Sequence, residues 1–324
     1  PLYVPDLPPF TPYLLDYFHR AHGLDACAMP LGGRSLALGR AETSSKEYLP
    51  FPALLGGILD IAHREAGPFQ ALLPATQGAE ADGQYPWAAA AVLRRRGLER
   101  VTLAAPVLER LPETASDPDL LLRAVLTGDV LLCAPPDRRT ELAPAHIPAW
   151  EELEALARGI GALPSSGRAL AAVGEPFTLF ALHDGVLATL EQENWRLLRA
   201  PLGEYLWFLW RDAGSSLSGP WAKRMADLGP LLGARNSFSP DLEALREEAD
   251  RLLPGFAGAN GRYRIAKALE LGRRSSGVLT LAPRYENTAA LLDMTGALEG
   301  IPHFHLAMDN DWDEGAWSRL NSFL

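Results

Sequence analysis

The segment at residues 69–85 constrains the fold more than any other part of the sequence. It begins with the apolar run 69–73, passes through a turn that contains two glycines, and enters a helical pattern at 84–96. A buried strand that leads through such a turn into a helix is the unit from which parallel sheets are built. Open α/β sheets place their chemistry in loops at the carboxyl ends of the strands, so this loop is the first candidate site.

The alternation of strand and helix signals repeats along the chain. In the first half, strand patterns lie at 2–4, 25–29, 69–73 and 100–105, with helical patterns between them at 12–22 and 53–66. In the second half, strand patterns lie at 170–173, 197–200, 277–281 and 304–308. Alternation of this kind implies parallel pairing through right-handed crossovers. The sequence therefore predicts an α/β fold of two parallel-sheet, Rossmann-like (flavodoxin-like) domains.

A linker-like segment separates the two series of strands. Residues 163–167 read Leu-Pro-Ser-Ser-Gly, a composition typical of a loop. We therefore expect an N-terminal α/β domain at 1–165 and a C-terminal α/β domain at 166–324, with a cleft between them. The C-terminal domain carries a long helical insert at about 203–262. The N-terminal domain ends in helical patterns that proline-rich segments separate.

Composition excludes several classes of protein. The 324 residues allow two domains, and a net charge of −10 without a basic stripe argues against nucleic acid as a partner. No apolar run is long enough to cross a membrane, and the first residues lack a signal-peptide pattern. Cys27 and Cys133 are expected to be buried free thiols in a cytoplasmic protein. Because the chain starts at Pro1, we expect a trimmed chain or a piece of a larger parent polypeptide.

The glycine-bearing loop also carries a recognisable motif. Gly78, Gly83, Gln84 and Tyr85 have the spacing of a loop that reads Gly-Pro-Cys-Arg-x-Gly-Gln-Tyr, with Glu80 in place of the cysteine. The segment resembles this loop of the 2-hydroxyacyl-CoA dehydratase and CoA-enzyme-activase-associated family. In that family the cysteine is a ligand of an iron–sulfur cluster.

Further segments carry the same resemblance in the same order. Residues 43–50 are similar to the family's Thr-Ser-x-Lys-Glu-Cys-x-Pro loop, with Tyr48 in place of the cysteine. Residues 281–287 are similar to its Met-Pro-Phe-x-Cys-Met-Pro segment, with Glu286 as the substitute. Residues 173–176 repeat its Val-Gly-Glu-Pro strand end, and 319–324 resemble its C-terminal Arg-Leu-Glu-x-Phe. The resemblance implies a divergent member in which all three expected cluster ligands are replaced.

The resemblance also implies where the candidate site lies. In the family the three loops meet in the cleft between the domains, which would bring Tyr48, Glu80 and Glu286 together. Two carboxylates that meet repel each other, so the pKa of one should rise unless a cation or hydrogen bond compensates. Arg284 is the expected neutralising cation. The remaining candidate cleft residues lie beside Glu80 in sequence and are Asp82, Gln84 and Tyr85.

Two functions fit this reading. The first is a non-redox homologue without a cofactor, which acts as a scaffold, a partner subunit or a ligand-binding domain, with a small molecule or a CoA thioester as the possible ligand. The second is a metal-dependent or acid–base enzyme that uses Glu80, Glu286 and Tyr48, with an acyl-CoA as its candidate substrate. Their oxygen atoms would suit a hard divalent cation such as Mg²⁺, Mn²⁺ or Ca²⁺, with Asp82 as a further ligand. The sequence alone leaves both open.

The ligand replacement predicts the outcome of an iron reconstitution. Carboxylate and phenol oxygens are poor substitutes for thiolates, so the purified protein should not assemble an iron–sulfur (4Fe–4S) cluster. After anaerobic incubation with iron and sulfide, followed by desalting, we expect no cluster absorbance. A stoichiometric absorbance that survives desalting would contradict this prediction.

Overall fold

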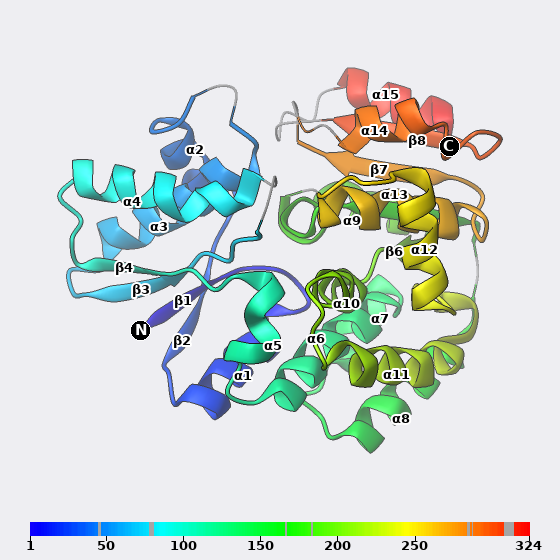
Figure 1. Ribbon diagram of the computed structural model, residues 1–324, viewed down its shortest axis with the longest axis horizontal. Coiled ribbons are helices and arrows are strands. Elements are labelled where there is room, and N and C mark those ends of the chain that lie inside the picture. Colours follow the sequence, from blue (N-terminus) through cyan, green and yellow to red (C-terminus); the bar gives the residue numbers. More distant parts are fainter. Residues whose placement is uncertain are drawn as a thin grey trace.

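Two four-stranded parallel sheets form the framework of the protein (Figure 1). The structure is a computed structural model that describes residues 1–44, 47–77, 81–165, 167–182, 184–283, 286, 288–307 and 314–324. The first sheet comprises β1 (Leu2–Pro5), β2 (Ala26–Met29), β3 (Phe69–Leu72) and β4 (Val101–Ala104). The second comprises β5 (Ala169–Gly174), β6 (Arg196–Arg199), β7 (Val278–Ala282) and β8 (His303–Ala307). The predicted α/β fold with two parallel sheets is confirmed.

The two sheets share one topology. The strand orders are β2-β1-β3-β4 and β6-β5-β7-β8, and every pairing is parallel. In each sheet the chain first moves to one side of the opening strand and then crosses to the other. The strand order therefore reverses next to β1 and next to β5, and doubly wound sheets bind ligands beside such a point.

Helices connect the strands and fill the space beside the sheets. Those of the first half are α1 (Thr11–His22), α2 (Arg34–Arg40), α3 (Pro50–Arg64), η1 (Ala81–Gln84), α4 (Tyr85–Arg95), η2 (Leu108–Arg110), α5 (Leu111–Thr114), α6 (Pro118–Leu132), α7 (Pro136–Leu142) and α8 (Trp150–Gly161). Those of the second half are η3 (Thr178–Leu182), α9 (Asp184–Gln192), α10 (Leu202–Asp212), α11 (Ser218–Leu228), η4 (Gly229–Arg235), α12 (Leu242–Leu252), α13 (Ala259–Gly272), α14 (Thr288–Thr295) and α15 (Glu314–Phe323).

Two of the helices that the sequence did not reveal have clear physical origins. The prolines at 135–136 read as a separator, but Pro136 is the first residue of α7, where its fixed backbone angle suits a helix start. The helix α2 follows two glycines, and no helix is predicted for it from the sequence. It packs closely on α3, since Gly39 and Gly56 let the two backbones meet: a Cβ at Gly56 would lie 1.6 Å from the carbonyl oxygen of Ser35. The helix α3 begins two residues after the candidate residue Tyr48.

The helix α6 joins the two halves. It packs against α1 on one side and α10 on the other, in the lower middle of Figure 1. Gly128 of α6 leaves room for the ring of Phe10, because a Cβ there would lie 2.2 Å from a ring carbon. The same ring lies edge-on to Phe180 of η3, with 4.9 Å between ring centroids. Because α6 contacts both halves, the domain boundary at 165–166 stays a prediction.

A buried carboxyl adds a polar link at the same place. Asp129 of α6 accepts hydrogen bonds from the backbone N–H groups of Leu202 (2.8 Å) and Gly203 (2.7 Å) at the start of α10. These donors and the positive end of α10 favour the carboxylate. Burial opposes them and raises the pKa of Asp129 to about 8. Asp129 thus fixes the first turn of α10 against the first half.

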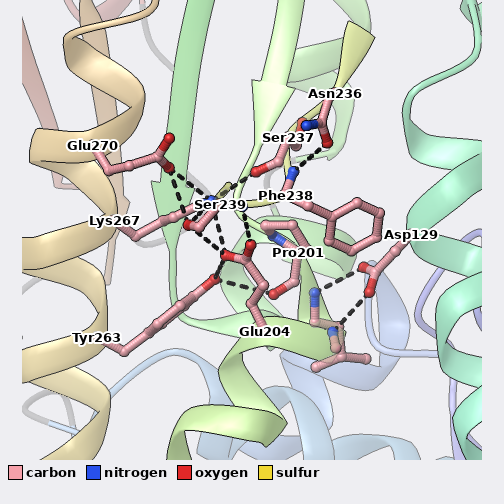
Figure 2. A network of polar contacts seen from close by, with 12 residues as sticks. Asp129, Pro201, Glu204, Asn236, Ser237, Phe238, Ser239, Tyr263, Lys267 and Glu270 are labelled. Atoms are coloured by element: carbon pink, nitrogen blue, oxygen red, sulfur yellow. Dashed lines mark hydrogen bonds and ion pairs between the residues drawn. The ribbon is translucent and has the colours of Figure 1, made fainter. Parts of the chain in front are cut away.

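A second buried network holds α10 against α13 (Figure 2). Lys267 and Glu204 are both fully buried, and the Nζ atom of Lys267 lies 2.8 Å from Oε2 of Glu204. The same Nζ donates to the carbonyl oxygen of Ser237 at 2.6 Å and lies 2.9 Å from Oε2 of Glu270. Burial raises the pKa of Glu204, and the charge of Lys267 lowers it. Lys267 has two carboxylate partners, whereas it is the ion-pair partner that the structure gives for Glu204, so the negative charge of Glu204 depends on Lys267.

The network predicts a strong response to the loss of its cation. Lys267→Met should lower the free energy of unfolding by about 3–5 kcal/mol at neutral pH, because it leaves the carboxyl of Glu204 buried and unpaired. Urea denaturation measures the loss, which should shrink at acidic pH and be partly recovered in the Lys267→Met/Glu204→Gln double variant. The control is Arg211→Met, which breaks the exposed 2.7 Å pair between Arg211 of α10 and Glu243 of α12. That change should cost no more than about 1 kcal/mol. Equal costs for the two single variants would contradict the prediction.

Candidate functional site

A cavity of about 500 Å³ lies where the two halves meet. Most of its wall is apolar and comes from α1, α6, α10 and the segments that follow β1, β3 and β4. Leu7 follows β1, Pro74 follows β3, and Pro176 follows β5, all at the carboxyl ends of their strands. The cavity therefore lies beside the points of strand-order reversal in both sheets, the place where α/β sheets bind ligands.

Two carboxyl groups line this apolar cavity. Among the described lining residues, Asp82 and Glu175 are the acids, and they come from different halves of the chain. Asp82 lies in η1 after β3, and Glu175 directly follows β5. An apolar cavity with a small number of converging polar groups is the usual form of a small-molecule site.

Glu175 is held by the backbone that follows it. Its carboxylate accepts hydrogen bonds from the N–H groups of Phe177 (3.0 Å) and Thr178 (2.9 Å) and from the Thr178 hydroxyl (3.0 Å). These donors lower its pKa, but burial outweighs them, and the charge of Asp82 adds to the rise. The pKa of Glu175 reaches about 7. Near neutral pH the group therefore exists in both protonation states.

Asp82 is positioned by a tight turn. The Thr76 hydroxyl donates a hydrogen bond to its Oδ1 atom, and burial is the main cause that raises the pKa of Asp82. Gly83 allows this geometry, because a Cβ there would lie 2.6 Å from the carbonyl oxygen of Thr76. The glycine that the motif contains is thus needed for close approach of the backbone.

Of the two candidate tyrosines, Tyr85 feels the charges of both acids. Tyr85 is buried and stacks on Phe51, with ring centroids 5.0 Å apart. Burial raises the pKa of Tyr85 well above its usual value, and the charges of Glu175 and Asp82 contribute next, ahead of half-buried Tyr48. The structure thus brings Tyr48, Asp82 and Tyr85 into one electrostatic neighbourhood with Glu175. The other candidate of this loop, Gln84, is exposed.

Glu286 has a different surrounding. Its Oε1 lies 3.2 Å from Nη1 of Arg264, a buried residue of α13. Burial and then the charge of Arg264 lower the pKa of His305, whose Nδ1 lies 2.9 Å from the Thr280 hydroxyl oxygen. Glu80 and Arg284 lie outside the described residues. The predicted meeting of Glu80 with Glu286, and the neutralising role of Arg284, therefore stay predictions.

The sequence did not single out Glu175 and Arg264 as site residues. Glu175 had a usable signal, since it is an acid directly after a fully buried apolar strand and precedes a proline. The signal for Arg264 was weaker. It is one of three cations at 262, 264 and 267 on a largely buried helix that carries a single acid, Glu270, and buried cations need acidic partners.

The donor atoms do not fit an iron–sulfur cluster. Tyr48 and Glu286 stand where the resemblance expects thiolates, while Cys27 is on β2 and Cys133 follows α6. Oxygen donors suit hard divalent cations instead. In the described part of the chain, no three His, Cys, Asp or Glu side chains are grouped as a metal ion would require.

No protein-family model matches the chain, and no curated protein matches it. None of the described helices combines the length and apolar character needed to cross a membrane.

The raised pKa of Glu175 predicts a pH-dependent stability. Because the folded pKa is above the unfolded one, the folded state binds the proton more tightly, and stability falls as pH rises from about 4.5 to about 7. Glu175→Gln removes this titration. The difference in unfolding free energy, wild type minus variant, should fall by up to about 1 kcal/mol per pH unit across this range and then level off. Glu113→Gln, at an exposed position, is the control. A difference that does not vary with pH would contradict the prediction.

Proposed function

We propose that this protein binds a small, largely apolar molecule in the cavity between its halves. One observation carries the proposal: a cavity of about 500 Å³ opens at the carboxyl ends of strands from both sheets, and two acids with raised pKa values lie in its apolar wall. Apolar surface that a ligand buries there contributes roughly 25 cal/mol per Å². The site is a binding pocket first, whatever chemistry follows.

The two acids limit the polar end of the ligand. An anionic head group beside Asp82 and Glu175 would be repelled, or would require their protonation. A cationic or hydroxyl head group can donate a hydrogen bond to either carboxylate. We therefore propose an alkyl or aromatic ligand with an amine or hydroxyl end. The family resemblance supports a further candidate ligand, the acyl chain of a CoA thioester.

The resemblance supports a wider version of the same proposal. In it, the chain is a cytoplasmic, non-redox homologue of the 2-hydroxyacyl-CoA dehydratase and activase-associated proteins that keeps the cleft and the Gly83–Tyr85 turn but lacks the cluster thiolates. The resemblance is what supports a role as a scaffold or partner subunit, either alone or within a larger polypeptide. Ligand binding rests also on the cavity.

A second candidate function is acid–base catalysis at the same place. The supporting observation is the pKa of about 7 for Glu175, which suits a group that both takes and gives protons at neutral pH. In this version Glu175 replaces the predicted trio of Glu80, Glu286 and Tyr48 as the main acid–base group. With an acyl-CoA, Glu175 would take a proton from water as the water oxygen bonds to the thioester carbonyl carbon. As the carbon–sulfur bond then breaks, Glu175 would return that proton to the sulfur, so that a carboxylic acid and the thiol of CoA are the products.

Filling the cavity tests the binding proposal. Ala105 lines the cavity and is exposed, so Ala105→Trp should block the space at little cost in stability. Aminoanthracene, an uncharged fluorescent probe, should bind the wild type, and the variant should bind it about tenfold more weakly or worse. The matched control is Ala91→Trp, at an exposed position of α4 outside the cavity. Equal binding by the wild type and Ala105→Trp, or no binding by either, would contradict the proposal.

Head-group preference and turnover separate the two functions. At about pH 8 octylamine and octanol should displace the probe much better than octanoate, and the deficit of octanoate should shrink at about pH 5.5. Equal displacement by all three at both pH values would contradict the role of the acids. Release of CoA from octanoyl-CoA, followed by chromatography and lost in Glu175→Gln, would favour the enzyme.

A further inference from the structure

A second cavity, of about 340 Å³, lies at the end of the second sheet that is opposite to the first cavity. Its wall comes from the end of α6, the start of α7, the segment before β5 and the turn from α9 into β6. Arg196 is the first residue of β6, so this cavity lies at the amino end of a strand, whereas Glu175 follows the carboxyl end of β5. In the described part of the chain the two cavities share no lining residue.

Arg235, at the end of η4, is the central group of this second cavity. The residue is only 8% exposed to solvent. One Nη atom donates a hydrogen bond to the carbonyl oxygen of Pro164, but its buried Nε has no hydrogen-bond partner. No carboxylate among the described residues forms an ion pair with Arg235. A guanidinium group stays charged, so its burial without an anion is costly.

Arg196 brings a second positive charge to the same wall. Its Nη1 donates to the Ser165 hydroxyl, and its Nε is also buried without a hydrogen-bond partner. No described carboxylate forms an ion pair with it either. Burial and then the charge of Arg196 lower the pKa of Arg235. Two like charges on one cavity wall destabilise each other unless an anion lies between them.

Most of the acids near this cavity already form ion pairs with other arginines. Glu191 lines the cavity, but its carboxylate oxygens lie 2.5 Å and 3.0 Å from nitrogens of Arg139 and Arg199. Arg138, also on the wall, is paired with Glu141 at 2.8 Å. The remaining lining acid is Asp137, which is exposed at the edge. The wall thus keeps a positive surplus on a chain whose net charge is −10.

We infer that Arg196 and Arg235 form a binding site for an oxyanion, the phosphate or carboxylate group of a small molecule. The planar fork of donors on each guanidinium matches both groups. The volume holds a small molecule rather than a peptide or nucleic acid strand. Cys133 lines the same cavity, and burial raises the pKa of its thiol to about 11. The thiol therefore stays protonated, and the site binds its ligand without a thiolate nucleophile.

Calorimetric titration of the full chain with inorganic phosphate tests this site. Malonate, in a parallel titration, represents the carboxylate ligands. We expect saturable binding of at least one anion, weakened by about tenfold or more in Arg196→Gln and Arg235→Gln. Arg211→Gln, which removes a cation from the exposed pair with Glu243, should bind as the wild type does.

One additional variant keeps the test decisive. Arg235→Lys keeps the charge but loses the fork, so it should bind more weakly than the wild type and more tightly than Arg235→Gln. If Arg235→Gln does not fold, Arg196→Gln and Arg235→Lys carry the comparison, and a loss in both supports the site. No saturable binding of phosphate or malonate up to about 10 mM would overturn the proposal. Unchanged affinity in Arg196→Gln would overturn it as well.

Discussion

The structure depends on charges that are buried where three helices meet. Lys267 and Glu204 neutralise each other between α13 and α10, and Asp129 of α6 holds the first turn of α10 by two backbone N–H groups. Each of these groups would be costly to bury alone, so each fixes where its partner lies. The arrangement sets α10 against α6, and both helices line the apolar cavity. The polar core is therefore what gives the cavity its shape.

The sequence predicted the sheets well because their strands are short apolar runs with helices between them. It failed where structure depends on contacts between distant residues. Nothing local near Gly39 indicates that the carbonyl of Pro52 will lie against it, yet this close approach is what lets α2 pack on α3. For α7 the failure was local, because a proline can begin a helix as well as end one.

The candidate site was predicted in part. The motif around Gly83 directed attention to Asp82, which lines the cavity, since a loop after a parallel strand reaches the ligand-binding edge of the sheet; the role of Asp82 and Tyr85 in a site stays a prediction. The sequence could not identify the acid that lines the cavity opposite Asp82. The packing of α6 against α10 decides which residues of the second half reach that position. Glu175 comes from that opposing half and raises the pKa of Tyr85. The pairing of Glu286 with Arg264 likewise joins residues that only the folded chain brings together.

The position of Phe10 has a consequence for how the chain unfolds. Its ring lies between Gly128 of α6 and Phe180 of η3, and the buried apolar residues around it form one cluster that runs through both halves. Two sheets usually suggest two units that melt independently. Here the halves cannot separate without exposing that shared apolar surface to water, so we expect the two sheets to unfold together.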